Sequence, residues 1–324
     1  MTNPVPEFSN AVSDKFEYDV SFVVTVYNKG PYVGPMLRSL KRQTGNFKRE
    51  FIFVDDGSTD NSVDLIRAET ADWENVRIIQ QLNSGPAVAT NTGGFAAKGE
   101  YIKIVDADDV MTPFATSSLL QTIRSTGVDY LYGRWRYADD PEAESLAEKE
   151  FVGEFQEYSD PLGHFFKHGM AGSTNVILRT SVFHEVGGAD PELFVQDMSM
   201  PLRFAKDHRI GTVDVMAVMG PKDVDGRIMG NNAEVVYSLS ATMYHFLRDN
   251  PDVKPELQRI AFKRCAGRAW KWAKRNHGKT FFSREFGWYL LSRLPIWRET
   301  GPLIGKTIKV WKRDNIRRMT SLPD

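Results

Sequence analysis

Two acidic clusters in this sequence have the composition and spacing needed to bind a cation or a nucleotide. Asp106 and Asp108 are separated by one residue, and Asp55 is followed directly by Asp56. Two carboxylates on one turn can hold a hard divalent cation, Mn²⁺ or Mg²⁺, and leave coordination positions open for phosphate oxygens. The same residue types also suit a capped turn that leads into a helix. The Asp106 to Asp108 spacing alone therefore leaves metal binding and a structural turn both open.

The pair Asp55 and Asp56 suits the recognition of a nucleoside. A carboxylate at the end of a strand can accept hydrogen bonds from a base or from ribose hydroxyls, and Gly57 lets the backbone turn closely. A strand-to-helix turn with Asp60 as the N-cap explains the same residues and is compatible with nucleoside binding.

Short apolar runs precede both clusters and must position them. Four runs have the composition of buried parallel strands, namely Val20 to Val26, Phe51 to Val54, Val76 to Ile79 and Tyr101 to Val105. Segments with helical spacing separate them, and this alternation predicts an α/β fold with a Rossmann-like, mostly parallel sheet flanked by helices. Such sheets bind ligands at the carboxyl ends of their strands, where both acidic clusters lie. Carboxylates that meet at one edge repel each other unless a cation or hydrogen bonds neutralise them.

The middle of the chain is less regular. It contains a predicted strand from Asn175 to Leu178, a predicted helix from Asp197 to Ala205, and a loop rich in glycine and charge from Gly220 to Asn232.

Composition limits the class of protein. With 324 residues, 41% hydrophobic and 26% charged, the chain has room for one large α/β domain with an appended segment. The single cysteine, Cys265, cannot form an internal disulfide, which fits a reducing compartment. The start has no apolar signal segment, and no apolar run is long enough to span a membrane. We therefore expect a cytoplasmic protein and no nucleic-acid partner.

The charge is unevenly distributed. Residues 255–324 contain 17 basic and 5 acidic residues, a net charge of +12, so residues 1–254 carry −13 of the total of −1. Three apolar stripes at helical spacing lie in this basic segment, beginning at Phe262, Phe282 and Ile304. Packing on the rest of the protein explains them, and so does attachment to an anionic membrane surface at the inner face of the cell membrane. We expect a loose tail at 1–17, a catalytic domain at 18–252 and a basic helical region at 253–324.

Four segments, in matching order, resemble the family 2 glycosyltransferases of the GT-A fold. They are Phe22 to Lys29, Asp55 to Asp60, Gly85 to Gly93 and Ala97 to Asp109, and the resemblance continues with Gly187 to Asp197. The resemblance implies an inverting transfer of a sugar from a nucleotide-sugar donor, most often a UDP-sugar, with the help of a divalent metal. It also implies a glycan or a lipid-linked saccharide as acceptor.

The resemblance also assigns roles to individual residues. Asp108 is the expected metal ligand, and Asp197 is the expected general base, which takes the proton of the acceptor hydroxyl as its oxygen attacks the anomeric carbon. A helix N-terminal acid is the structural alternative for Asp197. The expected donor-binding residues are Thr25, Tyr27, Asn28, Asp55, Asp56, Asn83, Gly85, Asp106 and Arg227.

Two residues depart from the family pattern. Gln196 stands where a glutamate usually precedes the general base, and Thr90 stands where an arginine is common. Arg227, in the glycine-rich loop, is the expected replacement for the missing cation, with Lys222 as the second candidate.

Other functions fit the sequence less well. A sugar-phosphate nucleotidyltransferase would carry a glycine-rich phosphate loop after the first strand, where this chain has Tyr27, Asn28 and Lys29. A nucleotide-sugar-binding scaffold without turnover would not need Asp197. Metal-dependent release of a nucleoside diphosphate distinguishes a transferase from a scaffold.

Overall fold

A computed structural model describes residues 16–170, 172–222, 232–294, 300–314 and 316. The strands are β1 (Tyr18–Val26), β2 (Arg49–Asp55), β3 (Val76–Gln80), β4 (Gly99–Asp106), β5 (Val110–Met111), β6 (Tyr130–Ala138), β7 (Phe155–Glu157), β8 (Val176–Arg179) and β9 (Ile210–Pro221). The helices are α1 (Gly30–Lys41), α2 (Ser62–Glu69), α3 (Pro86–Ala96), α4 (Ala115–Thr126), α5 (Pro141–Ala147), α6 (Pro161–His168), α7 (Thr180–Glu185), α8 (Ser199–Asp207), α9 (Asn232–Asp249), α10 (Pro255–Asn276), α11 (Arg284–Leu291), α12 (Gly301–Ile308) and the 3₁₀ helix η2 (Lys309–Arg313).

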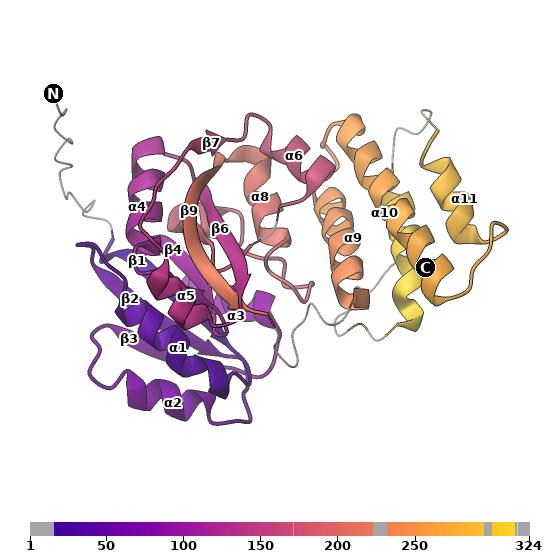
Figure 1. Ribbon diagram of the computed structural model, residues 1–324. Helices are drawn as coiled ribbons and strands as arrows, with labels where there is room; N and C mark the ends of the chain where they lie inside the picture. The colour runs from indigo at the N-terminus through magenta and orange to yellow at the C-terminus, as the bar shows by residue number, and fades with distance from the viewer. Residues whose placement is uncertain (1–15, 171, 223–231, 295–299, 315, 317–324) are drawn as a thin grey trace.

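The first part of the chain forms a parallel sheet in the order β3-β2-β1-β4 (Figure 1). Its strands are the four predicted apolar runs, each extended by one to three residues in total. Successive residues of each strand point to opposite faces of the sheet, and each face has its own hydrophobic core. Val23 packs on the face covered by α3, whereas Phe22 and Val24 pack on the face that contains the apolar residues of α1. Burial on both faces explains why β1, β2 and β4 read as continuous apolar runs, whereas β3 is only partly buried. The predicted α/β fold with flanking helices is confirmed.

Beyond β4 the sheet becomes mixed. β8 pairs antiparallel with both β4 and β6, β9 runs parallel to β6, and β5 and β7 pair antiparallel with β9. The predicted strand near Asn175 is confirmed as β8. The helix predicted to begin at Asp197 begins two residues later, because Asp197 and Met198 form a turn and do not cap α8.

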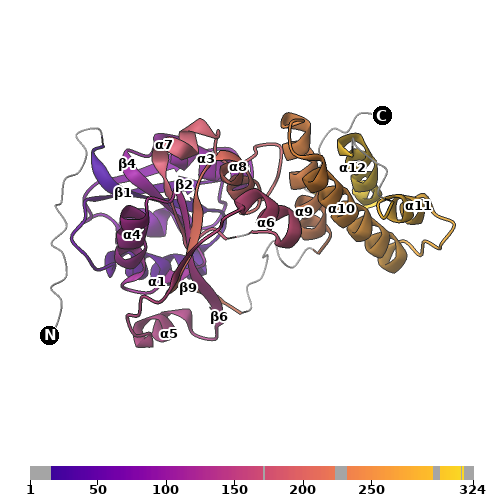
Figure 2. The same cartoon turned by 90° about the horizontal axis from the view of Figure 1, so that it is seen from above.

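The C-terminal helices pack beside the sheet domain, with α9 between α10 and α8 (Figures 1 and 2). They share one hydrophobic core with α3, α7 and α8, which includes Phe262, Ile304 and Trp311. α9 and α12 are in close contact, since a Cβ atom added to Gly305 would lie 2.8 Å from the ring of Tyr244. In the described part of the chain, no helix combines the length and the apolar character needed to cross a membrane.

Candidate active site

The two acidic clusters meet at one edge of the sheet, as the sequence predicts. In the register of the parallel strands, Thr25 of β1 lies opposite Asp106 of β4, and Val26 lies opposite Asp55 of β2. The Thr25 hydroxyl donates a long hydrogen bond, 3.4 Å, to Oδ1 of Asp106. The carboxyl ends of β2 and β4 therefore carry Asp55, Asp56, Asp106 and Asp108 on the two sides of β1, and these four residues form the acidic edge.

Asp55 and Asp56 are both buried and have different amounts of free hydrogen-bonding capacity. Asp55 accepts hydrogen bonds from the Ser58 amide at 3.1 Å and the Gln80 side chain at 3.3 Å. Asp56 accepts three, from the side chain of Gln81 and from the amides of Ser84 and Gly85, each at 2.8 Å. A carboxylate has about four acceptor positions, so Asp55 retains more capacity for a nucleoside and Asp56 mainly shapes the loop before α3.

The loop before α3 requires glycine at position 85. Gly85 has a positive φ of 83°, and a Cβ atom there would lie 3.1 Å from the ring of Phe194. The backbone amide of Gly85 donates to Asp56. Asn83, two residues earlier, is exposed at the surface of the loop. Gly85 thus allows close packing between this loop and the segment that leads to Asp197.

The loop after β1 is held by Asn28. This residue adopts a left-handed conformation, φ 50°, which asparagine tolerates better than most residues. Its amide donates to the Ser58 hydroxyl at 2.9 Å, and its side-chain oxygen accepts from the Thr59 amide at 2.8 Å. Tyr27 is left 44% exposed at the same edge, available to a ligand.

Asp106 is enclosed by hydroxyl and amide donors. The Ser173 hydroxyl donates to its Oδ2, the Gln196 side chain donates to its Oδ1 at 3.3 Å, and its own amide donates to the Thr174 hydroxyl at 2.9 Å. Burial raises the pKa of Asp106, and the negative charge of Asp108 raises it further, while the hydrogen bond from Ser173 lowers it. The structure therefore supplies donors where acidic groups would otherwise repel each other.

A buried lysine supports the turn that carries Ser173 and Thr174. Lys103 of β4 has no exposed surface, and its ammonium group donates to the carbonyl oxygens of Thr174 and Ile104. Burial lowers the pKa of Lys103 to about 7, although the charges of Asp109 and Asp106 favour its protonated form. Lys103 thus links the end of β4 to the turn that contacts Asp106.

Asp108 forms an ion pair in this structure. The ammonium group of Lys29 lies 2.8 Å from Oδ2 of Asp108, and the two side chains are 21% and 11% exposed. The position of Lys29, directly after Asn28, brings a cation from the β1 loop to the acidic edge. The Asp108 carboxylate is thus paired with a positive charge in this structure.

The side chains at this edge would suit a divalent cation whose remaining ligands are supplied by water and by the phosphates of a bound donor. Among the described residues, no group of three or more His, Cys, Asp or Glu side chains could hold a metal ion. Mg²⁺-type sites commonly use one or two carboxylates, with water and substrate phosphates as the other ligands. Asp108 offers a hard oxygen ligand of this kind, and the long side chain of Lys29 would have to move aside for a cation to bind there.

Asp197 lies near the same edge, in the turn before α8. Its Oδ1 atom is buried and, within the described part of the chain, has no hydrogen-bond partner. Burial raises the pKa of Asp197 to about 6, with a further contribution from the charge of Asp106. This geometry argues against a helix-capping role, because a cap would place the carboxylate against helix amides.

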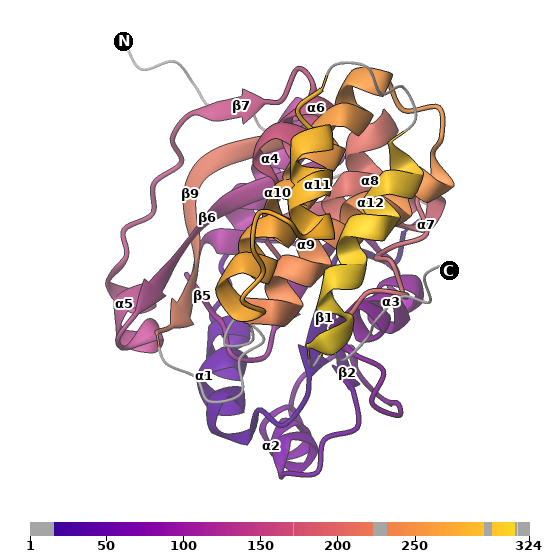
Figure 3. The same cartoon turned by 90° about the vertical axis from the view of Figure 1, so that its right-hand side faces the viewer.

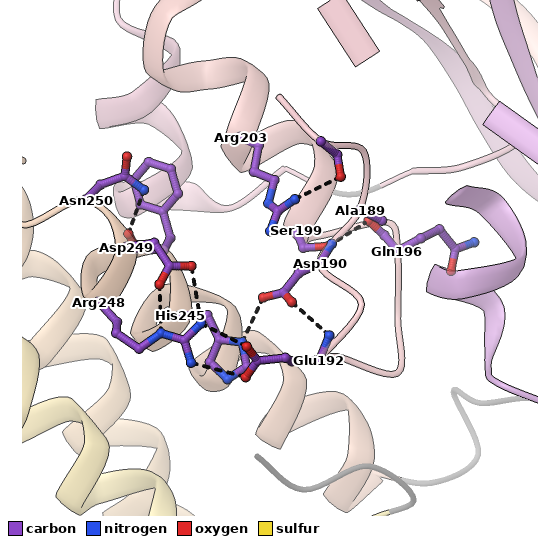
Figure 4. A network of polar contacts seen from close by, with 12 residues as sticks. Ala189, Asp190, Glu192, Gln196, Ser199, Arg203, His245, Arg248, Asp249 and Asn250 are labelled. Carbon is purple, nitrogen blue, oxygen red and sulfur yellow. Dashed lines mark hydrogen bonds and ion pairs between the residues drawn. The ribbon is translucent and has the colours of Figure 1, made fainter. Parts of the chain in front are cut away.

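The segment that carries Asp197 is fixed by polar contacts from two directions. Asn91 of α3 both donates to and accepts from the backbone of Ala189 at 2.8 Å. On the other side, the buried Asp190 carboxylate lies 2.7 Å from Nδ1 of His245 in α9, while its amide donates to Ser199 (Figure 4). The C-terminal helices therefore help to position the turn that contains Asp197.

The two departures from the family pattern have different structural consequences. Gln196 is buried and is the amide donor to Asp106, so a neutral residue is hydrogen-bonded there. Thr90 is buried in α3, and its hydroxyl has no hydrogen-bond partner among the described residues. Arg227 lies outside the described residues. Lys222 forms an ion pair of 2.5 Å with Asp139.

Replacing Gln196 with glutamate should shift the pH dependence of catalysis. The substitution removes a donor to Asp106 and adds a negative charge beside the carboxylates, which disfavours ionisation of Asp197. We expect the acidic limb of the profile of kcat/KM against pH to move up by about one unit. Gln121→Glu, on the exposed surface of α4, is the matched control. An unchanged profile in Gln196→Glu would contradict this account.

Several residues of the site were not predicted from the sequence. The acidic edge is contacted only after the chain folds by Lys29, Ser173 and Thr174, which lie up to 79 residues away from their partners. Lys103 supports the turn that carries Ser173 and Thr174. A lysine in the middle of an otherwise apolar strand is the one signal that pointed to an unusual position.

Comparison with known proteins agrees with this geometry. Residues 21–187, just over half of the chain, match the family described as "Glycosyl transferase family 2". Glycosyltransferase GlyG of Streptococcus pneumoniae is 38% identical over 122 residues, which cover 37% of this chain and 40% of that protein. The poly(ribitol-phosphate) beta-glucosyltransferase of Bacillus spizizenii is 42% identical over 93 residues, or 28% of this chain and 15% of that protein. The match thus spans less than half of each relative.

Solved structures resemble nearly the whole chain. The S. aureus TarS 1-349 structure in complex with UDP-GlcNAc has a TM-score of 0.61 at 20% identity and covers 90% of this chain and 81% of its own. Mannosyltransferase PcManGT from Pyrobaculum calidifontis, in complex with GDP-Man and Mn²⁺, has a TM-score of 0.57 at 15% identity and covers 93% and 88%. At these identities the likeness shows the shared GT-A fold alone. The family match over more than half of the chain shows that the chain belongs to glycosyl transferase family 2.

Proposed function

We propose that the protein transfers a sugar from a UDP-sugar to an acceptor hydroxyl by a single displacement that inverts the anomeric configuration. The acceptor oxygen attacks the anomeric carbon and forms the new bond. The bond from that carbon to the diphosphate breaks, and the nucleoside diphosphate leaves with the electron pair. The acceptor proton passes to Asp197. The complex of TarS with UDP-GlcNAc supports UDP as the nucleotide, and that of PcManGT with GDP-Man makes GDP the alternative to test.

The observation that carries this proposal is the state of Asp197. Its Oδ1 atom is buried and has no hydrogen-bond partner in the described part of the chain, and its pKa is raised to about 6. Such a carboxylate is ionised at neutral pH yet accepts a proton more readily than an ordinary aspartate does. Buried carboxylate oxygens usually have a hydrogen-bond donor, so an unpaired one beside the acidic edge suits a group that takes a proton from a substrate.

The donor would bind along the acidic edge. Asp55 has free acceptor positions for the nucleoside, and Thr25, Tyr27, Asn28 and the loop with Asn83 and Gly85 surround the same edge. Asp106 would contact the ribose or the diphosphate, and Asp108 would hold the divalent cation. When bound, Mn²⁺ or Mg²⁺ neutralises negative charge on the departing diphosphate. Arg227 is proposed as an additional contact to the donor.

The acceptor is proposed to be a glycan or a lipid-linked saccharide, and the protein to work in the cytoplasm at the inner face of the cell membrane. Residues 18–252 form the proposed catalytic domain, and the basic region 253–324 is the proposed membrane contact.

Nucleoside diphosphate release from a panel of nucleotide sugars, with and without Mn²⁺, tests this proposal. We expect cation-dependent release with a UDP-sugar, and a product whose anomeric configuration, read by NMR coupling, is opposite to that of the donor. Donors that bind the folded protein will also raise its Tm. Retained configuration would exclude the single displacement, and binding without turnover for every acceptor would favour a scaffold.

A further inference from the structure

The three apolar stripes of the C-terminal region differ in their burial. Phe262 in the first stripe is 1% exposed, and Ile304 and Trp311 in the third are fully buried. The second stripe differs from both. No residue of α11, all of which the structure describes, is buried, and Phe282 just before it is 100% exposed. Only the second stripe is available to a partner.

The connection between α10 and α11, residues 277–283, is the distal tip of the molecule. It lies at the end of the helical region farthest from the sheet, and α11 lies on the outer surface there (Figures 1, 2 and 3). This end also exposes Leu290 and Leu294, at 50% and 46%. Among the described residues of the helical region, the exposed large apolar side chains all lie between Phe281 and Leu294, and Phe282 is the most exposed of them.

The aromatic side chains at the distal tip are held in place. The ring of Phe281, which is 64% exposed, lies 5.9 Å from that of Trp270 and 5.0 Å from that of Phe286. Phe286 in turn lies 5.0 Å from Trp270. These ring contacts hold Phe281 against α10 and α11. The neighbouring Phe282 is fully exposed. Clustered apolar exposure of this kind marks an interaction site more often than scattered single residues do.

Cations surround the distal tip. Residues 255–294 contain ten basic and two acidic residues, a net charge of +8. Lys271, Lys274 and Arg275 are exposed in the last turns of α10, and Arg284 is exposed at the start of α11. The Lys274 ammonium group lies 5.9 Å from the Phe281 ring. Exposed phenyl rings bordered by lysine and arginine are complementary to a surface that is anionic outside and apolar beneath.

We propose that the distal tip docks on an anionic lipid bilayer, with Phe281 and Phe282 at the boundary between headgroups and acyl chains. The neighbouring cations contact the lipid phosphates. A soluble polyanion such as an acidic glycan would attract the same cations, but it offers no apolar layer to cover the phenyl rings. The exposed aromatic pair therefore favours a membrane over a polyanion. This proposal identifies which part of the basic region makes the membrane contact, and it does not depend on the identity of the donor.

Sedimentation of the full chain with vesicles tests the proposal without any need for activity. We expect binding to phosphatidylcholine vesicles that contain phosphatidylglycerol, weaker binding at high salt, and none to phosphatidylcholine alone. Phe281→Ser/Phe282→Ser and, separately, Lys271→Gln/Lys274→Gln/Arg275→Gln should each weaken binding by at least about tenfold. Phe151→Ser, which removes a phenylalanine that is 62% exposed in the sheet domain, is the matched control and should bind like the wild type.

Two results would overturn the proposal. One is the absence of sedimentation of the wild type with anionic vesicles at low salt. The other is unchanged binding of Phe281→Ser/Phe282→Ser, which would indicate a contact made by charge alone, as with a polyanion. Unchanged Tm and unchanged donor hydrolysis in the same variants will show that the fold and the site are intact.

Discussion

Replacing Asp197 with asparagine is expected to reduce kcat for sugar transfer by roughly 10²- to 10⁴-fold, the usual contribution of a general base. Asparagine has nearly the same shape as aspartate and cannot accept the acceptor proton. Donor binding should survive, because the acidic edge formed by Asp55, Asp106 and Asp108 is unchanged. The measurement is kcat and KM for transfer, together with the donor-induced rise in Tm.

The same substitution should stabilise the protein at neutral pH. Because the pKa of Asp197 is raised to about 6 from an ordinary value of 3.8, the folded state holds this proton more tightly than the unfolded state. The ionised carboxylate then destabilises the fold above pH 6, by about 1–3 kcal/mol for a half-buried group. Asp197→Asn removes this cost and should raise Tm by a few degrees.

The pH dependence of the stability difference between wild type and Asp197→Asn tests this expectation independently. Below about pH 4 the carboxyl group is protonated in both the folded and the unfolded state, so wild type and Asp197→Asn should have similar stability. As the pH rises from about 4 to about 6, the Tm of Asp197→Asn should increasingly exceed that of the wild type, and the difference should then stay constant. Wild-type kcat should fall as the pH drops through about 6, because the protonated group is no longer a base.

Asp207→Asn is the matched control, since Asp207 is an exposed aspartate at the end of α8. It should change neither kcat nor the stability difference with pH. If Asp197→Asn instead lost stability and activity together, Asp197 would be a structural residue, and the proposed inverting mechanism would lose its base.

The sequence was sufficient to predict the parallel half of the sheet. There β1, β2 and β4 are buried on both faces, so continuous apolar runs such as Val20 to Val26 and Tyr101 to Val105 reveal them directly. The acidic residues at the ends of these strands could be placed at one edge for the same topological reason.

The mixed half of the sheet depends on contacts that are distant in sequence. β6 carries exposed and buried residues in an irregular order, and β9 pairs with it across more than 70 residues. Ser173 and Lys29 are common residue types in ordinary loops, and only the folded arrangement brings them to Asp106 and Asp108. The state of Asp197 could not be predicted either, because burial and the charge of Asp106 determine its pKa.

Replacing Asp108 with alanine is expected to abolish the cation-dependent part of donor binding. Asp108 is the proposed metal ligand of the acidic edge, and the ammonium group of Lys29 lies 2.8 Å from its Oδ2 atom. Without Asp108, the cation loses its protein ligand, and charge on the diphosphate is no longer neutralised from this side. We expect kcat/KM to fall by more than about 100-fold, which corresponds to roughly 3 kcal/mol of transition-state stabilisation.

Thermal shift with a UDP-sugar measures this effect directly, in Mn²⁺ and again in chelator. Wild type should show a donor-dependent rise in Tm only with the cation, and Asp108→Ala should show none in either condition. Asp72→Ala is the matched control, because Asp72 forms an exposed ion pair with Lys41 at 3.0 Å and should leave donor binding unchanged. Lys29→Met tests the role of the Lys29 ammonium group separately from that of the proposed cation. It removes the ammonium group that competes with the cation, so the Mn²⁺ concentration for half-maximal activity should fall. Donor affinity and chelator-insensitive activity retained in Asp108→Ala would instead show that the acidic edge works through Lys29 and not through a metal.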